Sequence, residues 1–151
     1  MRLIAVGRLR DGPERALLER YVQRLLPRLD LVEVTEARGA PGEIKRREAQ
    51  ALLGCLPPSA LAVALDEGGE QMDSLAFSAR LDSWLGSGRP VCFLIGGAEG
   101  LDGRVMARAD AALSLGPMTW PHMLVRGLLA EQLYRARAIS TGHPYHRAGR
   151  P

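Results

Sequence analysis

Short apolar runs alternate with longer amphipathic runs along the whole chain. The mainly apolar runs are Leu3–Val6, Leu31–Val34, Ala60–Leu65, Val91–Ile95 and Ala112–Leu115. Each has the length of a strand, and the fourth carries no polar residue, which is typical of a strand covered on both faces. Because amphipathic segments separate these runs, the pattern predicts an α/β protein with a mainly parallel sheet flanked by helices.

The amphipathic segments predict five helices. The first runs from Pro13 to Pro27, the second covers Glu43–Leu53, and the third begins at a cap, Asp73 or Ser74, and ends at Gly86-Ser-Gly88. The fourth covers roughly Gly103–Ala109, and the last has Pro121 in its first turn. The first helix is expected to have one apolar face, made of Leu17, Leu18, Tyr21, Val22, Leu25 and Leu26. The third is expected to direct three side chains to the core: Leu75, Ala79 and Trp84.

Length and composition indicate one globular domain over residues 1–151. The chain is 46% hydrophobic and 25% charged, and it has no run of 18 apolar residues that could cross a membrane. Met1–Val6 lacks the pattern of a signal peptide. Cys55 and Cys92 lie far apart in apolar segments, which favours reduced thiols in a cytoplasmic protein. After Thr141-Gly142 the tail, about 142–151, is expected to be extended.

Two loops at strand ends are candidate ligand sites. Gly96-Gly97-Ala98-Glu99-Gly100 follows the fourth strand, where glycines let a ligand approach the backbone. Its spacing is that of neither the dinucleotide-binding nor the P-loop motif, and a tight turn explains it equally well. Leu115–Trp120 offers backbone polar groups in an apolar frame, which suits a purine, although an ordinary packed loop has the same composition.

The carboxyl-terminal segment is basic and rich in titratable rings. Residues 117–151 hold one acid, Glu131, and five arginines, a local net charge of +4: Arg126, Arg135, Arg137, Arg147 and Arg150. Such a surface suits nucleic-acid phosphates, and a solvated helix face is the alternative. Glu131 and Arg135 are spaced for an ion pair on one helix face.

His143, Tyr145 and His146 are candidate acid–base groups, because histidine titrates near neutrality and tyrosine offers a phenol. A metal site is not expected. The only other histidine is His122, and no acid follows residue 131.

Four segments occur in an order that resembles the RlmH family of bacterial ribosomal RNA large-subunit methyltransferases. They are Phe93–Leu101, Leu115–Arg126, Glu131–Ala136 and His143–Arg147. The start Ile4-Ala-Val-Gly7 and Leu65-Asp-Glu67 also fit, so the resemblance covers the whole chain.

The resemblance implies a SPOUT-class enzyme with an α/β trefoil knot that acts as a homodimer. It implies that S-adenosylmethionine supplies a methyl group to N3 of a pseudouridine in 23S ribosomal RNA, on the assembled ribosome, with no metal and no membrane. Donor contacts would come from Leu65, Gly96, Gly97, Leu115, Gly116, Pro117, Met118, Thr119 and Trp120. Catalysis would fall to His143, Tyr145 and His146, with RNA contacts from Arg126, Arg135 and Arg147.

This chain departs from the family pattern at Ala98, where proline is usual, and at Trp120, where a smaller residue is common. Three alternatives remain open at this point: a related knotted methyltransferase acting on transfer RNA or a ribose hydroxyl, a non-catalytic RNA-binding assembly factor, and a hydrolase or nucleotide-binding domain. The His-Pro-Tyr-His tail disfavours the first, and the absence of a P-loop and of a nucleophile elbow disfavours the third.

Overall fold

A five-stranded sheet forms the middle layer of the protein in the computed structural model, which describes residues 1–146. All of its pairings are parallel, in the order β2-β1-β4-β3-β5. The strands are β1 (Arg2–Val6), β2 (Asp30–Val34), β3 (Leu61–Gln71), β4 (Val91–Ile95) and β5 (Ala111–Ser114). The predicted mainly parallel sheet is confirmed, and the apolar β4 is buried along its whole length.

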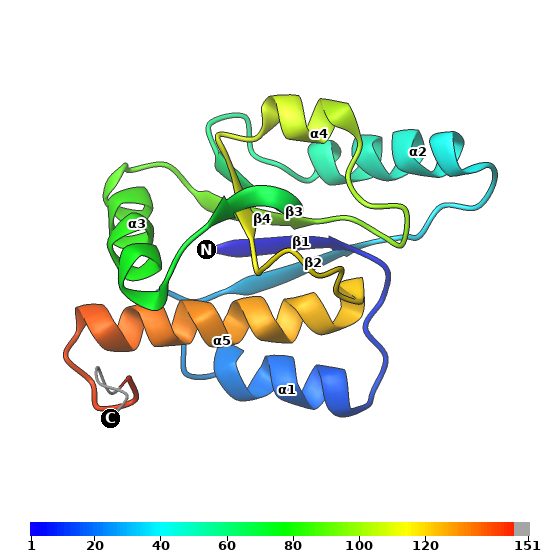
Figure 1. The fold of residues 1–151 in the computed structure, drawn as a ribbon. Coiled ribbons are helices and arrows are strands. Elements are labelled where there is room, and N and C mark those ends of the chain that lie inside the picture. Colours follow the sequence, from blue (N-terminus) through cyan, green and yellow to red (C-terminus); the bar gives the residue numbers. More distant parts are fainter. Residues whose placement is uncertain (147–151) are drawn as a thin grey trace.

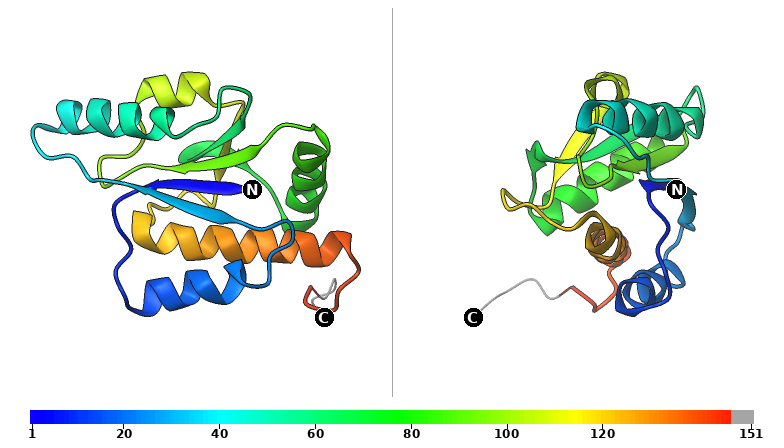
Figure 2. Two further views of the ribbon diagram at one scale, coloured as in Figure 1. Left: turned by 180° about the vertical axis from the view of Figure 1, so that it is seen from behind. Right: turned by 90° about the vertical axis from the view of Figure 1, so that its right-hand side faces the viewer.

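Helices cover both faces of the sheet (Figures 1 and 2). One face carries α1 (Pro13–Val22), α3 (Ser74–Gly86) and α5 (His122–Ser140), with α5 packed between the other two. The other face carries α2 (Pro41–Gly54) and α4 (Gly103–Arg108). Each face has its own buried cluster: Leu3, Phe93 and Leu129 belong to the first, and Ile4, Leu94 and Val105 to the second. Alternate residues of β1 and β4 therefore point to opposite cores.

Two helical predictions were wrong in detail. Helix α1 ends at Val22, so Leu26 lies outside it and is 77% exposed, although Leu25 is buried. In α3, Leu75 and Ala79 face solvent, and the core-facing stripe contains Phe77, Leu81 and Trp84. Asp73 caps this helix by accepting a hydrogen bond from the Ala76 N–H.

Strand β3 extends beyond the predicted stop at Leu65. Leu65 and Glu70 are both in register with Leu113, so the intervening residues form an irregularity and pairing resumes up to Gln71. A side chain at Gly69 would lie 2.7 Å from the Leu113 backbone, and the glycine therefore allows the strands to stay paired. The turn-like composition of residues 66–69 concealed this continuation.

Because all strands are parallel, their carboxyl ends share one edge of the sheet. The connections after β1, β2, β4 and β5 all begin at this edge, which is where open α/β sheets bind ligands. At the opposite edge Asp110 accepts a hydrogen bond from the Ala62 N–H and pairs with Arg89. Cys55 and Cys92 are free thiols, as predicted.

Candidate active site

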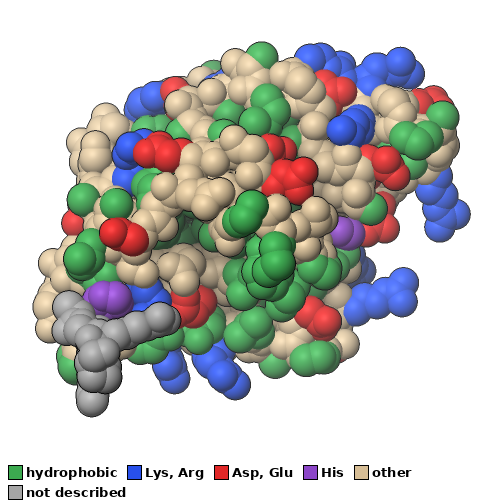
Figure 3. Space-filling view, viewed as in Figure 1, with side chains coloured by type: hydrophobic (Ala, Val, Ile, Leu, Met, Phe, Trp, Pro, Cys, Tyr) green, Lys and Arg blue, Asp and Glu red, His purple; other side chains and the backbone are tan. Residues whose placement is uncertain are grey.

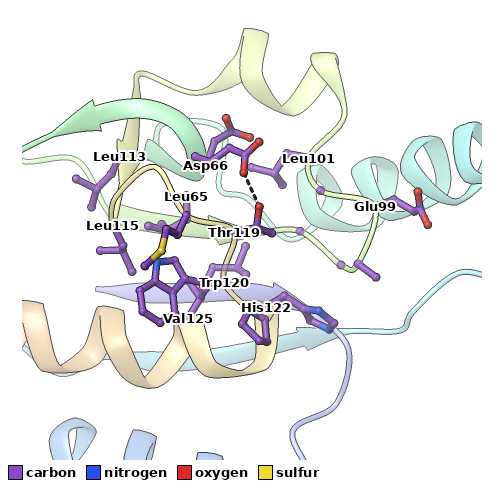
Figure 4. A pocket seen from close by; sticks show the side chains of 18 of the residues that line it. Leu65, Asp66, Glu99, Leu101, Leu113, Leu115, Thr119, Trp120, His122 and Val125 are labelled. Atoms are coloured by element: carbon purple, nitrogen blue, oxygen red, sulfur yellow. Dashed lines mark hydrogen bonds between the residues drawn. The ribbon is translucent and has the colours of Figure 1, made fainter.

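The two loops singled out in the sequence line one cavity of about 670 Å³ (Figure 4). Gly96 and Gly97 come from the β4–α4 loop, and Met118 and Trp120 come from the β5–α5 loop. Leu65 of β3 lies between them, because β3 is the neighbour of both β4 and β5. Of the nine residues predicted to bind the donor, eight line the cavity: Leu65, Gly96, Gly97, Leu115, Gly116, Met118, Thr119 and Trp120. Pro117 is not among the lining residues.

The glycine loop is a tight turn as well as a cavity wall. The Gly100 N–H donates to the Gly97 carbonyl at 3.0 Å, and Gly100 has a φ of 77°. A Cβ at Gly96 would lie 2.8 Å from the Gly100 carbonyl carbon, so the turn closes only with glycine there. The structural and ligand-binding interpretations of this motif are therefore compatible.

The cavity has apolar walls and an acidic rim. Asp66, Glu67 and Glu99 line it together with one lysine, Lys45. The Thr119 hydroxyl donates a hydrogen bond of 3.0 Å to Glu67, which ties the β5–α5 loop to β3 (Figure 4). The sequence interpretation missed these acids, although Asp66-Glu67 directly follows Leu65 at a predicted strand end. A negative rim suits a ligand that carries positive charge.

His122, the first residue of α5, also lines the cavity. Its Nε2 is buried, has no hydrogen-bond partner within the described residues, and lies 3.6 Å from Glu36 Oε1. The sequence interpretation considered His122 only as a possible metal ligand. Among residues 1–146 no group of three or more metal-binding side chains occurs, and no described helix is long and apolar enough to span a membrane.

Residues 142–146, the described part of the carboxyl-terminal tail, fold back on α5 in a turn, which differs from the extended conformation that was expected. The His143 N–H donates to the Ala138 carbonyl at 2.8 Å, and the Tyr145 ring packs against Tyr134 with 4.7 Å between centroids. The Tyr145 hydroxyl donates to Glu131 at 3.0 Å. Burial, followed by the hydrogen bonds to Tyr21 and Glu131, raises the pKa of Tyr145 above its ordinary value, so it keeps its proton at neutral pH here.

The β5–α5 loop, which lines the cavity, and residues 142–146 of the tail lie at opposite ends of α5 (Figure 1). His122 begins the helix at the cavity, and Ser140 ends it beside the tail. A 19-residue helix is about 28 Å long. The three catalytic candidates of one chain therefore do not reach the cavity of that chain, and a site containing both requires a second chain.

Two of the three predicted RNA-binding arginines are engaged with protein groups. Arg126 is fully buried, donates to Glu33 at 2.9 Å and to the Val6 and Gly7 carbonyls, and cannot contact RNA, so that prediction was wrong. Burial lowers the pKa of Arg126, and Glu33 opposes that shift.

Arg135 forms the predicted ion pair with Glu131, which is the first cause of its raised pKa, and it also stacks over Tyr145. Its guanidinium also lies 3.4 Å from Nδ1 of His146 in the tail. Arg137 pairs with Asp82. Arg147 and Arg150 lie outside the described residues.

Comparison with known proteins places this chain in a family. A family model described as "Predicted SPOUT methyltransferase" matches residues 1–146. A protein of Gluconacetobacter diazotrophicus named Ribosomal RNA large subunit methyltransferase H is 76% identical over 151 residues, covering 100% of this chain and 99% of that protein. A protein of the same name from Acidiphilium cryptum is 56% identical, covering 100% and 96%.

A solved structure agrees on the fold. The structure of a probable methylase family protein from Haemophilus influenzae Rd KW20 superposes with a TM-score of 0.57 at 8% identity, covering 97% of this chain and 70% of that one. Its low identity limits this likeness to the fold. On the family match and on the two close relatives, the chain belongs to the SPOUT methyltransferase family.

Proposed function

We propose that the protein is an S-adenosylmethionine-dependent methyltransferase that methylates N3 of a pseudouridine in 23S ribosomal RNA, acting as a cytoplasmic homodimer on the assembled ribosome. The observation that carries this proposal is the single cavity shared by the glycine loop and the β5–α5 loop, in a chain of a methyltransferase family. The names of the two close relatives support ribosomal RNA of the large subunit as the substrate.

The residues of the cavity fit the proposed donor. Its volume of about 670 Å³ lies within the range of small-molecule sites. Leu65, Leu115 and Val125 supply apolar surface for an adenine ring, while the backbone of the β5–α5 loop supplies polar groups for its edge. The acidic rim complements the positive charge of a sulfonium and an ammonium group, and Lys45 offers a partner for a carboxylate.

The donor supplies a methyl group that its sulfonium already activates. Two tasks remain for the protein: to hold that group in line with N3, and to remove the imide proton of N3 so that the nitrogen can attack. We assign the first task to the cavity and the second to His143 or His146. Tyr145 is assigned to orienting the base, because its phenol O–H can donate a hydrogen bond at neutral pH.

The tail that serves each cavity comes from the partner copy in this proposal. One chain holds its cavity and its tail at opposite ends of α5, so a dimer that joins the two is needed. Apolar groups suited to a dimer surround the cavity mouth: Met118 is 67% exposed and Trp120 is 38% exposed. In Figure 3 hydrophobic side chains gather on this face, over the β5–α5 loop. Leu124 and Leu128 of α5 are also only partly buried.

The test is incubation of the protein with labelled donor and either free ribosomal RNA or whole ribosomes, followed by mass mapping of the modified nucleotide. Methylation at pseudouridine N3, on ribosomes and not on free RNA, is the expected result. Methylation of a transfer RNA or of a ribose hydroxyl would replace the proposed substrate. Calorimetry with S-adenosylmethionine separates the enzyme from a non-catalytic assembly factor, since such a factor would bind ribosomes without binding the donor.

A further inference from the structure

Three arginines outside the basic carboxyl-terminal segment are free to meet a ligand. Arg8, Arg10 and Arg38 are exposed and make neither an ion pair nor a side-chain hydrogen bond with any described residue. Arg8 and Arg10 lie in the connection after β1, and Arg38 lies in the connection after β2. Because β1 and β2 are parallel neighbours, both connections begin at the sheet edge that carries the cavity.

The three side chains line one open groove of about 1300 Å³. The Leu9 side chain between the first two is buried, so the chain is anchored between them. The Leu9 N–H donates to Glu33 at 2.7 Å and its carbonyl accepts from Arg15 at 2.9 Å. These contacts fix the connection after β1, so Arg8 and Arg10 project from an anchored segment.

The acids in the groove offset only part of this positive charge. Two of them pair with an arginine: Glu33 contacts Arg126, and Asp11 contacts Arg15. Glu36 lies 3.6 Å from His122, which is charged only if it is protonated, and Glu14, in the first turn of α1, has no basic partner among the described residues. Three unpaired guanidinium groups therefore stand against two carboxylates.

The groove adjoins the cavity across the start of α5. His122 lines the cavity, and the next residue, Met123, lines the groove. Gly7 permits this close approach, because a Cβ there would lie 2.7 Å from Met123 Cε and 2.5 Å from Glu36 Oε1. An RNA strand whose target base enters the cavity can therefore continue into the groove.

We infer that the groove between the β1–α1 and β2–α2 connections binds the phosphates of the RNA strand that flanks the target nucleotide. Arg8, Arg10 and Arg38 are the contacts, since a guanidinium can hold a phosphate through two parallel hydrogen bonds. This inference rests on the proposed function, from which the RNA substrate comes. It moves the phosphate contacts from α5, whose described arginines are engaged, to the amino-terminal half of the chain.

The test compares two triple variants with the same change in net charge. The groove variant is Arg8→Ala, Arg10→Ala and Arg38→Ala. The control is Arg20→Ala, Arg24→Ala and Arg28→Ala, whose arginines are exposed and unpaired within residues 1–146 but lie outside the groove. Affinity for isolated large ribosomal subunits is measured over a series of salt concentrations. Donor affinity is measured separately by calorimetry with S-adenosylmethionine.

We expect the groove variant to bind ribosomal subunits at least about tenfold more weakly, and the slope of log affinity against log salt to fall by about 3. The control should keep the wild-type slope. The Arg8→Lys, Arg10→Lys, Arg38→Lys variant, which keeps the three positive charges, should have a slope close to that of the wild type. Equal slopes for the groove variant and the control would overturn the inference. A wild-type protein that binds subunits but not the donor would instead overturn the proposed function.

Discussion

The two ends of α5 differ in what they contact and in how firmly they hold it. At the amino end Arg126 is fully buried and joins the helix to Glu33 and to the carbonyls that end β1, beside the cavity. At the carboxyl end Arg135 is partly exposed, pairs with Glu131 on its own helix, and supports the tail. The amino end is bonded to strands β1 and β2, whereas the carboxyl end contacts the catalytic candidates through residues of α5 itself. The amino end of α5 is therefore fixed to the sheet beside the cavity, and the proposal that the tail serves another chain concerns the other, locally supported end.

The largest expected effect is on stability, and it compares the arginines at the two ends of α5. Arg126→Ala removes a fully buried guanidinium from the partly buried Glu33 and from the Val6 and Gly7 carbonyls, and it should lower the free energy of unfolding by about 3–5 kcal/mol. Arg135→Ala removes a partly exposed pair and should cost less than about 1 kcal/mol. Urea unfolding of both variants measures the difference. Similar losses at the two sites would remove the distinction between the two ends.

Gly96→Ala should distort the glycine loop that lines the cavity and leave the tail unchanged. Its Cβ would lie 2.8–2.9 Å from the carbonyl group of Gly100, and backbone atoms cannot rotate away. Overpacking of this kind costs about 1–3 kcal/mol, and we expect donor affinity to fall by at least about tenfold as the loop shifts. Calorimetry with S-adenosylmethionine provides the measurement.

The control for this loop variant is Gly54→Ala at the end of α2, where nothing lies within 4 Å of the added carbon. It should bind the donor like the wild type. Wild-type affinity in Gly96→Ala would contradict the assignment of the glycine loop to the donor site.

The double variant His143→Asn, His146→Asn should lose turnover and keep its donor affinity, whereas Gly96→Ala should lose donor affinity. Loss of a general base lowers turnover by about 100-fold or more. Donor affinity should stay unchanged, because the loops after β4 and β5, and not the histidines, are assigned to holding the donor. Single-turnover methylation of ribosomes and calorimetry separate the two quantities. Wild-type turnover in this variant would end the role of histidine as the base.

Asp110, at the sheet edge opposite the cavity, should affect stability alone. Burial would raise its pKa, but the Ala62 N–H and the Arg89 guanidinium outweigh burial and hold the pKa below its ordinary value. Since the pKa in the folded state is the lower one, the stabilisation is present above the unfolded pKa of about 4 and is lost as the pH falls through the folded pKa.

Asp110→Asn should therefore lower the free energy of unfolding at pH 7 by about 1 kcal/mol. The difference from the wild type should shrink in acid, with donor affinity unchanged. Urea unfolding at pH 7 and at pH 3 measures it. A difference that stays constant between these pH values would contradict the cause assigned to the shift.

The sequence allowed the strands and the two candidate loops to be predicted because they depend on local pattern, whereas the expectation that the loops share one donor site came from the family resemblance. Apolar runs such as Val91–Ile95 mark strands, and the shared edge of parallel strands brings the loops after β4 and β5 together. The contacts of Arg126 could not be predicted, because its partner Glu33 is 93 residues away and charge alone suggested RNA. The continuation of β3 past Leu65 depends on pairing with Leu113, which no local pattern encodes.

The distance between the tail and the cavity could not be predicted from the sequence either. His143 and His146 were correctly found to be absent from any helix, but the length of α5 sets how far they lie from the cavity. Only the folded helix reveals that one chain cannot join the two.

Mixed dimers test most directly whether a cavity works with the tail of its partner. One chain carries Gly96→Ala and the other carries His143→Asn and His146→Asn, each with its own affinity tag, so that only mixed dimers are purified. Each mixed dimer has one intact cavity facing one intact tail, and we expect about half of the wild-type methylation rate on ribosomes, since an isologous dimer has two equivalent sites. Mixed dimers as inactive as either parent would contradict the account, because a tail serving its own chain leaves no complete site.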